Sequence, residues 1–234
     1  KEHLSELSHI KDEPLKLYAS MLKSVDEGVG EILESLRSKG IEDNTLIVFL
    51  SDNGPARTNY LKGYPDDWPD VMLVAGDNRG LRGKKGEFFE GGIKVPFIAY
   101  WPNIINANSK NNKPIYSLDL YPTFSSVAKI DLPDGEVFEG LDLFPIFKNN
   151  SEELDRNNMI WIGDNRKRKS GAIRINNWKL VLDKRGKNHL FNIEKDPLEK
   201  HNLIQDEADK YQNLLEVFNK YLEDFPPPIT NRNK

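Results

Sequence analysis

A possible metal-binding arrangement of side chains follows directly after a short apolar segment. Residues 45–50 read Thr-Leu-Ile-Val-Phe-Leu, and Ser51-Asp-Asn-Gly54 follow them. In open α/β sheets ligands gather at the carboxyl ends of strands, where Asp52 and Asn53 would offer hard oxygen ligands suited to Ca²⁺ or Mg²⁺. The alternative interpretation is an ordinary turn, because Asp-Asn-Gly is also common turn chemistry.

A possible anion-binding loop lies in residues 81–93, which read Leu-Arg-Gly-Lys-Lys-Gly-Glu-Phe-Phe-Glu-Gly-Gly-Ile. Arg82, Lys84 and Lys85 are interleaved with glycines, so backbone N–H groups and cationic side chains could reach one anion together. The segment is not a Walker motif, because the spacing GxxxxGK[ST] is missing. A flexible, solvated basic loop is the alternative.

Several other kinds of catalytic site are not indicated. The four histidines, His3, His9, His189 and His201, lack metal-ligand spacing, and there is no HExxH motif. No GxSxG or Ser-His-Asp signature is visible. Cysteine is absent, which excludes disulfides, thiolate metal sites and a cysteine nucleophile within these residues, and which fits the cytosol and the periplasm equally.

The elements that must position these residues read as an α/β arrangement. Apolar residues recur at three- and four-residue steps over residues 15–39, which predicts a helix. The runs 45–50 and 95–101 lack alternation and predict strands that are buried on both faces. The segment 54–92 is rich in Gly, Pro, Asp and Asn and predicts a long functional loop, and residues 117–129 predict another helix.

The character of the sequence changes after Asn150. Short segments with partial alternation, separated by turn residues, predict an antiparallel meander with strands at 159–162, 171–175, 178–182 and 189–192. An amphipathic helix follows at 207–224. We therefore predict an α/β domain over residues 1–150, and a small antiparallel β subdomain with a packing helix over residues 151–234.

The charge balance limits the choice of partners. The chain has 33 Lys and Arg against 37 Asp and Glu, and this mild acidity argues against a nucleic-acid-binding protein. No apolar run is long enough for a membrane span, and the first residues show no signal-peptide pattern. Residues 163–188 hold nine Lys and Arg and two Asp, a basic strip that could steer a polyanion or form a solvated hairpin face.

Several motifs occur together in a recognisable order. They are Tyr18–Gly30, Gly40–Gly54, Leu81–Gly86, Phe89–Pro96, Tyr100–Pro102, Ser117–Thr123, Ala172–Leu180 and Leu190–Leu203. This set closely resembles the second half of the arylsulfatase-type sulfatases, in the alkaline phosphatase superfamily. The resemblance implies part of an alkaline-phosphatase-like mixed-sheet sandwich, followed by the small antiparallel sheet and a C-terminal helix. It also implies that the complete protein hydrolyses sulfate monoesters.

The resemblance implies roles for particular residues. In the family, the Asp and Asn of a Ser-Asp-Asn-Gly motif ligate Ca²⁺. These two residues correspond here to Asp52 and Asn53. In the family, the lysine of an Arg-Gly-Gly-Lys-Gly motif binds the substrate sulfate and offsets negative charge on the leaving group. This lysine corresponds here to Lys85. Lys84 stands where the family usually has Gly, so an ambiguity of one residue remains. Glu90-Gly91-Gly92 resembles the family's structural turn after this loop.

The main departure from the family concerns the nucleophile. Family members attack with formylglycine, made within a Cys/Ser-x-Pro-x-Arg motif that these residues lack. The resemblance therefore implies that the nucleophile and the remaining Ca²⁺ ligands lie upstream, in a missing N-terminal half. We expect the chain alone to be inactive, and its strands 46–50 and 97–101 to expose apolar edges. Because family members are commonly exported, the resemblance implies a periplasmic or secreted protein.

The sequence does not identify the substrate, and two alternatives to a sulfatase stay open. The basic strip favours a sulfated polysaccharide over a small aryl sulfate. One alternative is a phosphodiesterase or phosphonate hydrolase of the same superfamily. The other is a non-catalytic polyanion-binding fragment that uses the basic strip and releases no sulfate.

Overall fold

The chain forms two compact units. The computed structural model describes residues 2–57, 74–135, 138–150, 152–156, 158–163 and 170–224. Unit 1 comprises Lys1–Asp77 and Val95–Asp155, and unit 2 comprises Asn78–Lys94 and Arg156–Lys234. The domain boundary after residue 150 stays a prediction. Residues 78–94 group with the C-terminal unit, and they include residues 82–86, called here the basic glycine loop.

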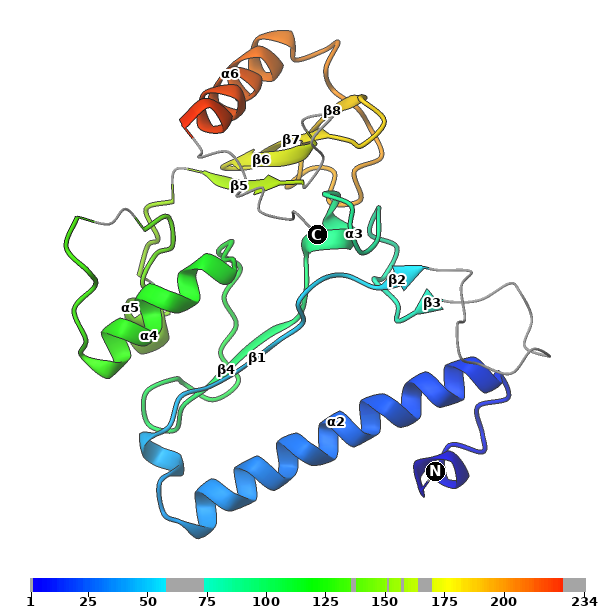
Figure 1. Cartoon of the computed structure of the whole chain (residues 1–234), viewed down its shortest axis with the longest axis vertical. Coiled ribbons are helices and arrows are strands. Elements are labelled where there is room, and N and C mark those ends of the chain that lie inside the picture. Colours follow the sequence, from blue (N-terminus) through cyan, green and yellow to red (C-terminus); the bar gives the residue numbers. More distant parts are fainter. Residues whose placement is uncertain are drawn as a thin grey trace, which may run out of the picture. The chain divides into compact units, whose positions relative to one another are not determined.

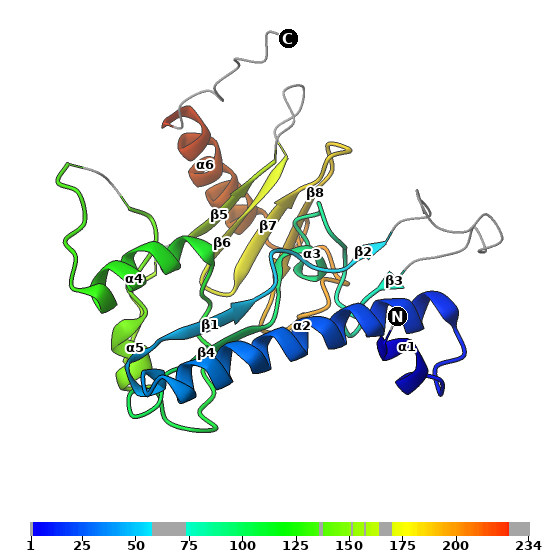
Figure 2. The same cartoon turned by 60° about the horizontal axis from the view of Figure 1, so that its bottom comes forward.

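Unit 1 contains one long helix and a two-stranded sheet. Helix α2 (Glu13–Ser38) begins after Asp12, whose carboxylate accepts a hydrogen bond from the Leu15 N–H at 2.8 Å. Strands β1 (Ile47–Leu50) and β4 (Phe97–Tyr100) pair antiparallel. Figure 2 shows α2 beside this pair, and residues of the helix and of both strands line one groove. The predicted helix and both predicted strands are therefore confirmed.

The other elements of unit 1 are short. They are α1 (Glu2–Glu6), η1 (Glu42–Asn44), β2 (Ala56–Arg57), β3 (Val74–Ala75), η2 (Ser117–Asp119), α4 (Leu120–Ala128) and α5 (Phe144–Lys148). The helix predicted over 117–129 is thus a 3-10 turn followed by α4. The buried carboxylate of Asp119 stabilises this junction, since it accepts hydrogen bonds from the N–H groups of Tyr116 at 2.9 Å and Leu141 at 2.8 Å.

The expected burial of β1 and β4 on both faces is not observed. Phe49 is 42 % exposed and Ile98 is 58 % exposed, and Val25 and Ile32 of α2 are more than half exposed. A two-stranded sheet beside one helix has too few neighbours to cover both of its faces. Unit 1 therefore presents an open apolar surface. Within the described residues, nevertheless, no helix has both the length and the apolar character that crossing a membrane requires.

Unit 2 is built on a four-stranded antiparallel meander (Figure 1). Its strands, hydrogen-bonded in sequence order, are β5 (Met159–Ile162), β6 (Gly171–Ile175), β7 (Trp178–Leu182) and β8 (Asn188–Asn192). Helix α6 (Ala208–Asp224) lies over one face of this sheet. The predicted strands and C-terminal helix are confirmed to within one residue at each end.

Both faces of the meander are covered, which explains why its strands alternate only partially. On one face, Leu180 belongs to a core cluster that includes Leu214 of α6. On the other face, Val181 belongs to a second cluster with Phe89, which immediately precedes the short helix α3 (Glu90–Ile93). Phe88 and Phe89, which lie between the basic glycine loop and α3, thus cover this second face.

Candidate functional site

The predicted metal ligands lie directly after β1, in unit 1. The Ser51 hydroxyl donates a hydrogen bond to the Asn53 carbonyl oxygen at 3.0 Å, which closes a tight turn. The side-chain oxygen Oδ1 of Asn53 is buried and has no hydrogen-bond partner in the described part of the chain. Asp52 beside it is exposed. A buried polar atom without a partner costs about 1–3 kcal/mol, so this oxygen is in the state expected of a cation ligand.

Asp52 and Asn53 do not form a complete calcium site by themselves. Ca²⁺ takes about six to eight oxygen ligands. Across the described ranges, no group of three or more His, Asp or Glu side chains is placed to hold a metal ion. The orphaned Asn53 oxygen therefore fits a Ca²⁺ ligand, but a site built on this turn needs further oxygens from elsewhere.

The basic glycine loop, residues 82–86, belongs to unit 2 and is closed at its base. The Gly91 N–H donates a hydrogen bond to the Arg82 carbonyl oxygen at 2.6 Å. Gly83 and Gly86 have φ angles of 90° and 82°, in the left-handed region that favours glycine. The interleaved glycines noted in the sequence are thus required by the path of the backbone.

The segment predicted as a structural turn, Glu90-Gly91-Gly92, forms the first part of α3. A Cβ atom at Gly92 would lie 2.1 Å from the Glu87 carbonyl oxygen and 2.6 Å from that of Lys84. Such distances leave no room for a side chain. The paired glycines therefore let α3 lie against the backbone of the basic glycine loop.

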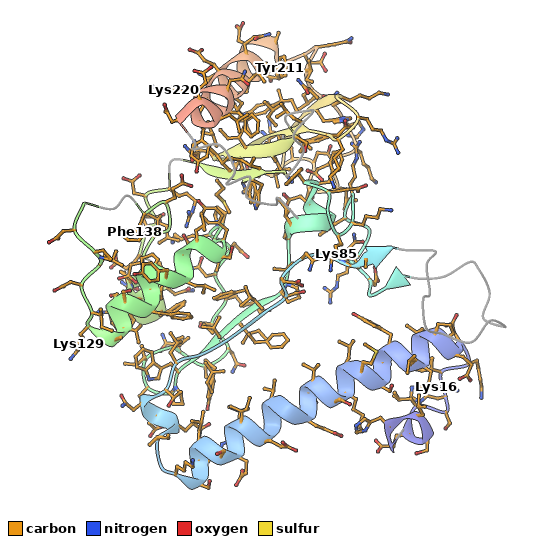
Figure 3. The ribbon with its side chains drawn as sticks, viewed as in Figure 1. Lys16, Lys85, Lys129, Phe138, Tyr211 and Lys220 are labelled. Atoms are coloured by element: carbon orange, nitrogen blue, oxygen red, sulfur yellow. The ribbon has the colours of Figure 1, made fainter. Side chains whose placement is uncertain are left out.

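The two candidate sulfate-binding lysines differ in their surroundings. Lys85 is exposed, and Figure 3 labels it on the loop that leads into α3. Lys84 is half-buried and has an interaction partner. Both lysines belong to unit 2, whereas Asp52 and Asn53 belong to unit 1. The structure thus groups the predicted residues into two pairs, one in each unit.

A buried ionic cluster, made of Glu90, Lys179 and Glu199, is not predicted from the sequence. The Lys179 ammonium group lies 2.8 Å from Glu90 Oε1 and 2.9 Å from Glu199 Oε1. The Glu90 N–H donates a hydrogen bond to Glu199 Oε2 at 2.7 Å. Burial raises the pKa of Glu199, although the nearby Lys179 ammonium group acts in the opposite direction. The one signal in the sequence is a lysine inside an otherwise apolar strand, residues 178–182.

The basic strip predicted at 163–188 needs a correction. Lys179 is completely buried in the ionic cluster and contributes nothing to a surface. Three other cations of the strip are exposed at the turn between β7 and β8: Lys184, Arg185 and Lys187. Four more lie outside the described residues: Arg166, Lys167, Arg168 and Lys169.

A pocket of about 270 Å³ lies between this turn and the basic glycine loop. Its lining includes Arg82, Glu87, Phe89, Asp183, Lys184 and Arg185. The Arg82 guanidinium group lies 4.0 Å from the centroid of the Phe89 ring. Asp183 lies 3.4 Å from His189, whose pKa is lowered by burial although Asp183 favours its charged form. The loop that carries Lys85 thus borders a pocket of mixed charge.

Comparisons with known proteins agree on one family. A sulfatase family profile matches residues 4–130, and a profile for the C-terminal region of N-sulphoglucosamine sulphohydrolase matches residues 83–226. The chain is 31 % identical over 140 residues to steryl-sulfatase from Homo sapiens, which is 59 % of this chain and 23 % of that protein. It is 34 % identical over 135 residues to N-acetylgalactosamine-6-sulfatase from Mus musculus, which is 55 % of this chain and 22 % of that protein. The chain thus spans less than a quarter of the length of either relative.

Solved structures agree with the expected fold. The crystal structure of Ps i-CgsB is similar with a TM-score of 0.81 and 30 % identity, over 94 % of this chain and 46 % of that chain. The sulfatase PsFucS1 from Pseudoalteromonas sp. is similar with a TM-score of 0.65 and 26 % identity, over 86 % of this chain and 41 % of that chain. These similarities confirm the predicted mixed α/β fold of the alkaline-phosphatase-like type. The chain belongs to the sulfatase family, and it is of the arylsulfatase type that its motifs resemble.

Proposed function

We propose that this chain is part of a Ca²⁺-dependent sulfatase that hydrolyses sulfate monoesters. The observation that carries the proposal is the exposed Lys85 on a closed glycine loop, in a chain of the sulfatase family. The partnerless oxygen of Asn53 supports the metal-binding part. The proposal concerns the native protein that contains this chain, because these residues match less than half of the solved relative Ps i-CgsB.

Asp52 and Asn53 would hold the calcium ion. The ion supplies positive charge that polarises the sulfate group and orients the attacking group. The two residues contribute a carboxylate and an amide oxygen, both of the hard type that Ca²⁺ prefers. We assign the remaining ligands to residues outside the printed sequence.

Lys85 would bind the sulfate group of the substrate. Its ammonium group donates hydrogen bonds to the sulfate oxygens and offsets the negative charge that develops on the leaving oxygen. An exposed ammonium group is accessible to a substrate arriving from solvent, whereas the half-buried Lys84 is already engaged. We therefore assign the role to Lys85.

We assign the nucleophile to a formylglycine outside these residues, since they contain no Cys/Ser-x-Pro-x-Arg motif. In this proposal the same upstream region completes the Ca²⁺ site and covers the open apolar surface of unit 1. In this proposal the chain alone forms no productive complex with the substrate and hydrolyses no sulfate ester. By family resemblance we also propose a periplasmic or secreted location.

A sulfated saccharide is the proposed substrate class. Ps i-CgsB has been solved in complex with k-i-k-neocarrahexaose, and that structure is similar to this chain with a TM-score of 0.80 and 30 % identity. The pocket beside the basic glycine loop offers Lys184 to a charged or hydroxylated neighbouring sugar. A small aryl sulfate would not reach this cation.

The test compares two variants of the full native protein, Lys85→Ala and its matched control Lys84→Ala. We expect Lys85→Ala to lower kcat/KM for a sulfate monoester by about 10²–10³-fold, the usual effect of losing one charge-stabilising donor. Lys84→Ala should have a much smaller effect. Sulfate release is the measurement. Equal activity of the wild type and Lys85→Ala would overturn the proposal.

Measuring sulfate release also distinguishes the proposed sulfatase from the two alternative functions. A phosphodiesterase or phosphonate hydrolase would turn over phosphate or phosphonate esters in preference to sulfate esters. A polyanion-binding fragment would bind a sulfated polysaccharide in a salt-sensitive manner and release no sulfate. Among the described residues, the strip cations left to form its binding surface would be Arg174, which is partly exposed, and the exposed Lys184, Arg185 and Lys187.

A further inference from the structure

Stability alone does not account for the buried ionic cluster of Glu90, Lys179 and Glu199. The side chains of Lys179 and Glu199 have no exposed surface, and that of Glu90 is 6 % exposed. Removing charges from water is costly, and replacing a buried ion pair by apolar residues of similar volume is often neutral or stabilising. A role in fixing the position of a neighbouring segment would explain the use of charged residues here.

Glu199 binds the chain on both sides of Lys85, at Arg82, where the basic glycine loop begins, and at Glu90, where α3 begins. Its backbone carbonyl oxygen accepts a hydrogen bond from Arg82 Nη1 at 2.9 Å, where the loop begins. Its carboxylate oxygen Oε2 accepts a hydrogen bond from the Glu90 N–H at 2.7 Å, where α3 begins. Lys85 lies between these two anchors in the sequence. One residue therefore fixes the two points from which the loop extends.

Lys179 connects these anchors to the sheet. It lies on β7, which is hydrogen-bonded to β6 on one side and to β8 on the other. Its ammonium group contacts the carboxylates of both Glu90 and Glu199. Because a strand paired on both sides has a well-defined position, Lys179 fixes both carboxylates relative to the sheet.

The arrangement around Arg82 and Glu199 is tightly determined. The Arg82 guanidinium group lies over the Phe89 ring, and the Arg82 carbonyl oxygen accepts the 2.6 Å hydrogen bond from Gly91. Glu199 has a φ angle of 54°, a left-handed conformation that residues other than glycine rarely adopt. Such a conformation persists where the surrounding contacts impose it.

We propose that Glu199 and Lys179 are positioning residues, which hold the loop bearing Lys85 at a fixed place on the C-terminal sheet. The inference rests on the proposed sulfate-binding role of Lys85. Neither Glu199 nor Lys179 contacts the substrate, and both act through the loop. A displacement of a reacting group by about 1 Å can cost about 10²-fold in rate, so loosening the anchors reduces turnover.

A double-mutant cycle tests this inference in the full native protein. The variants are Glu199→Gln, Lys85→Ala and the combination of both, and kcat and KM are measured with a sulfate monoester. Gln keeps the shape of Glu199 but lacks the charge that binds Lys179. We expect Glu199→Gln alone to lower kcat/KM by about 10²-fold and to have little further effect in the Lys85→Ala background. Glu207→Gln, the same change at an exposed position, is the matched control.

The cycle distinguishes positioning from a general structural role. A general loss of folded protein would lower activity by the same factor in the wild-type background and in the Lys85→Ala background. Equal factors in the two backgrounds would therefore overturn the inference and leave the role of Lys85 intact. If Lys85→Ala itself leaves kcat/KM unchanged, the proposed function fails, and the inference fails with it.

A second variant keeps the test decisive if Glu199→Gln lowers the folded fraction. Arg82→Lys retains the positive charge and leaves the buried carboxylates in place, but it removes the guanidinium group that spans the Glu199 carbonyl and the Phe89 ring. We expect a loss of activity that again disappears in the Lys85→Ala background. A loss of equal size in both backgrounds would contradict positioning.

Discussion

Asn53 shows how a single residue connects local structure to a proposed ligand. Its buried Oδ1 atom has no partner among the described residues, whereas its backbone oxygen is held by Ser51. Most buried polar side-chain atoms in folded proteins have a partner, so the exception calls for a cause. A calcium ion at this position would supply that cause, because Ca²⁺ accepts amide oxygens as ligands.

Replacing Asn53 by alanine should weaken calcium binding by the full native protein. We expect the Ca²⁺ affinity of Asn53→Ala to fall by about 10–100-fold or more, since even residues that only support metal ligands have effects of that size. The Ca²⁺-induced rise in Tm should shrink accordingly. Isothermal calorimetry and thermal unfolding measure the two quantities. The exposed Asn213→Ala variant is the control, and unchanged affinity in Asn53→Ala would contradict the assignment.

Local motifs pointed to some of the candidate site residues and not to others. Asp52, Asn53 and Lys85 lie in short motifs, so their residue types and spacing could be read from the sequence. Lys179 is different, because its partner Glu90 lies 89 residues away along the chain. No local pattern links residues so far apart. A lysine in an apolar strand signals only that some partner must exist if the residue is buried.

At the scale of elements, hydrophobic periodicity and turn residues were enough to predict most of the helices and strands. The meander β5–β8 and α6 were predictable because each strand is bounded by turn residues and the helix has one apolar face. The location of residues 78–94 was not predictable, because the segment lies between β3 and β4 of unit 1 in the sequence but packs in unit 2. Contacts with the meander, which periodicity does not report, decide this location.

Two glycine substitutions should have opposite effects on stability. A Cβ at Gly92 would overlap the Glu87 carbonyl oxygen, so Gly92→Ala should lower the free energy of unfolding by about 1–3 kcal/mol and reduce turnover by displacing the loop. A Cβ at Gly28, in α2, would meet no atom within 4 Å. Gly28→Ala should therefore raise the free energy of unfolding by about 0.4–1 kcal/mol. Thermal unfolding followed by circular dichroism measures the stability of both variants. A stabilising effect of Gly92→Ala would contradict the close approach of α3 to the loop.

At the scale of the whole molecule, the apolar surface of unit 1 is the feature that its own elements leave unexplained. A groove of about 380 Å³ is lined mainly by apolar residues of α2, β1 and β4, among them Leu22, Val25, Val29, Phe49 and Ile98. Contiguous apolar patches on proteins commonly mark surfaces that contact another partner. The chain covers 46 % of the solved relative Ps i-CgsB, so we propose that upstream residues of the native protein occupy this groove.

A pair of lysine substitutions in this groove should act in opposite directions in two forms of the protein. Leu22 is 51 % exposed and Ile98 is 58 % exposed in the present chain. In the isolated 234-residue chain, Leu22→Lys with Ile98→Lys should reduce the binding of an apolar dye and slow aggregation, because charges replace exposed apolar groups. In the full native protein, the same variant should lower the free energy of unfolding by about 3 kcal/mol or more, because the covering residues would bury unpaired charges.

Opposite effects in the isolated chain and in the full native protein are expected only if the groove is covered in the full native protein. Glu216→Lys, a charge change on the exposed side of α6 in unit 2, is the control and should affect both forms little. Dye fluorescence and denaturant unfolding measure the two quantities. If the double variant leaves the full native protein as stable as the wild type, the groove faces solvent there, and its proposed occupation by upstream residues is wrong. If it destabilises the full native protein but not the isolated chain, residues outside this sequence cover the groove formed by α2, β1 and β4.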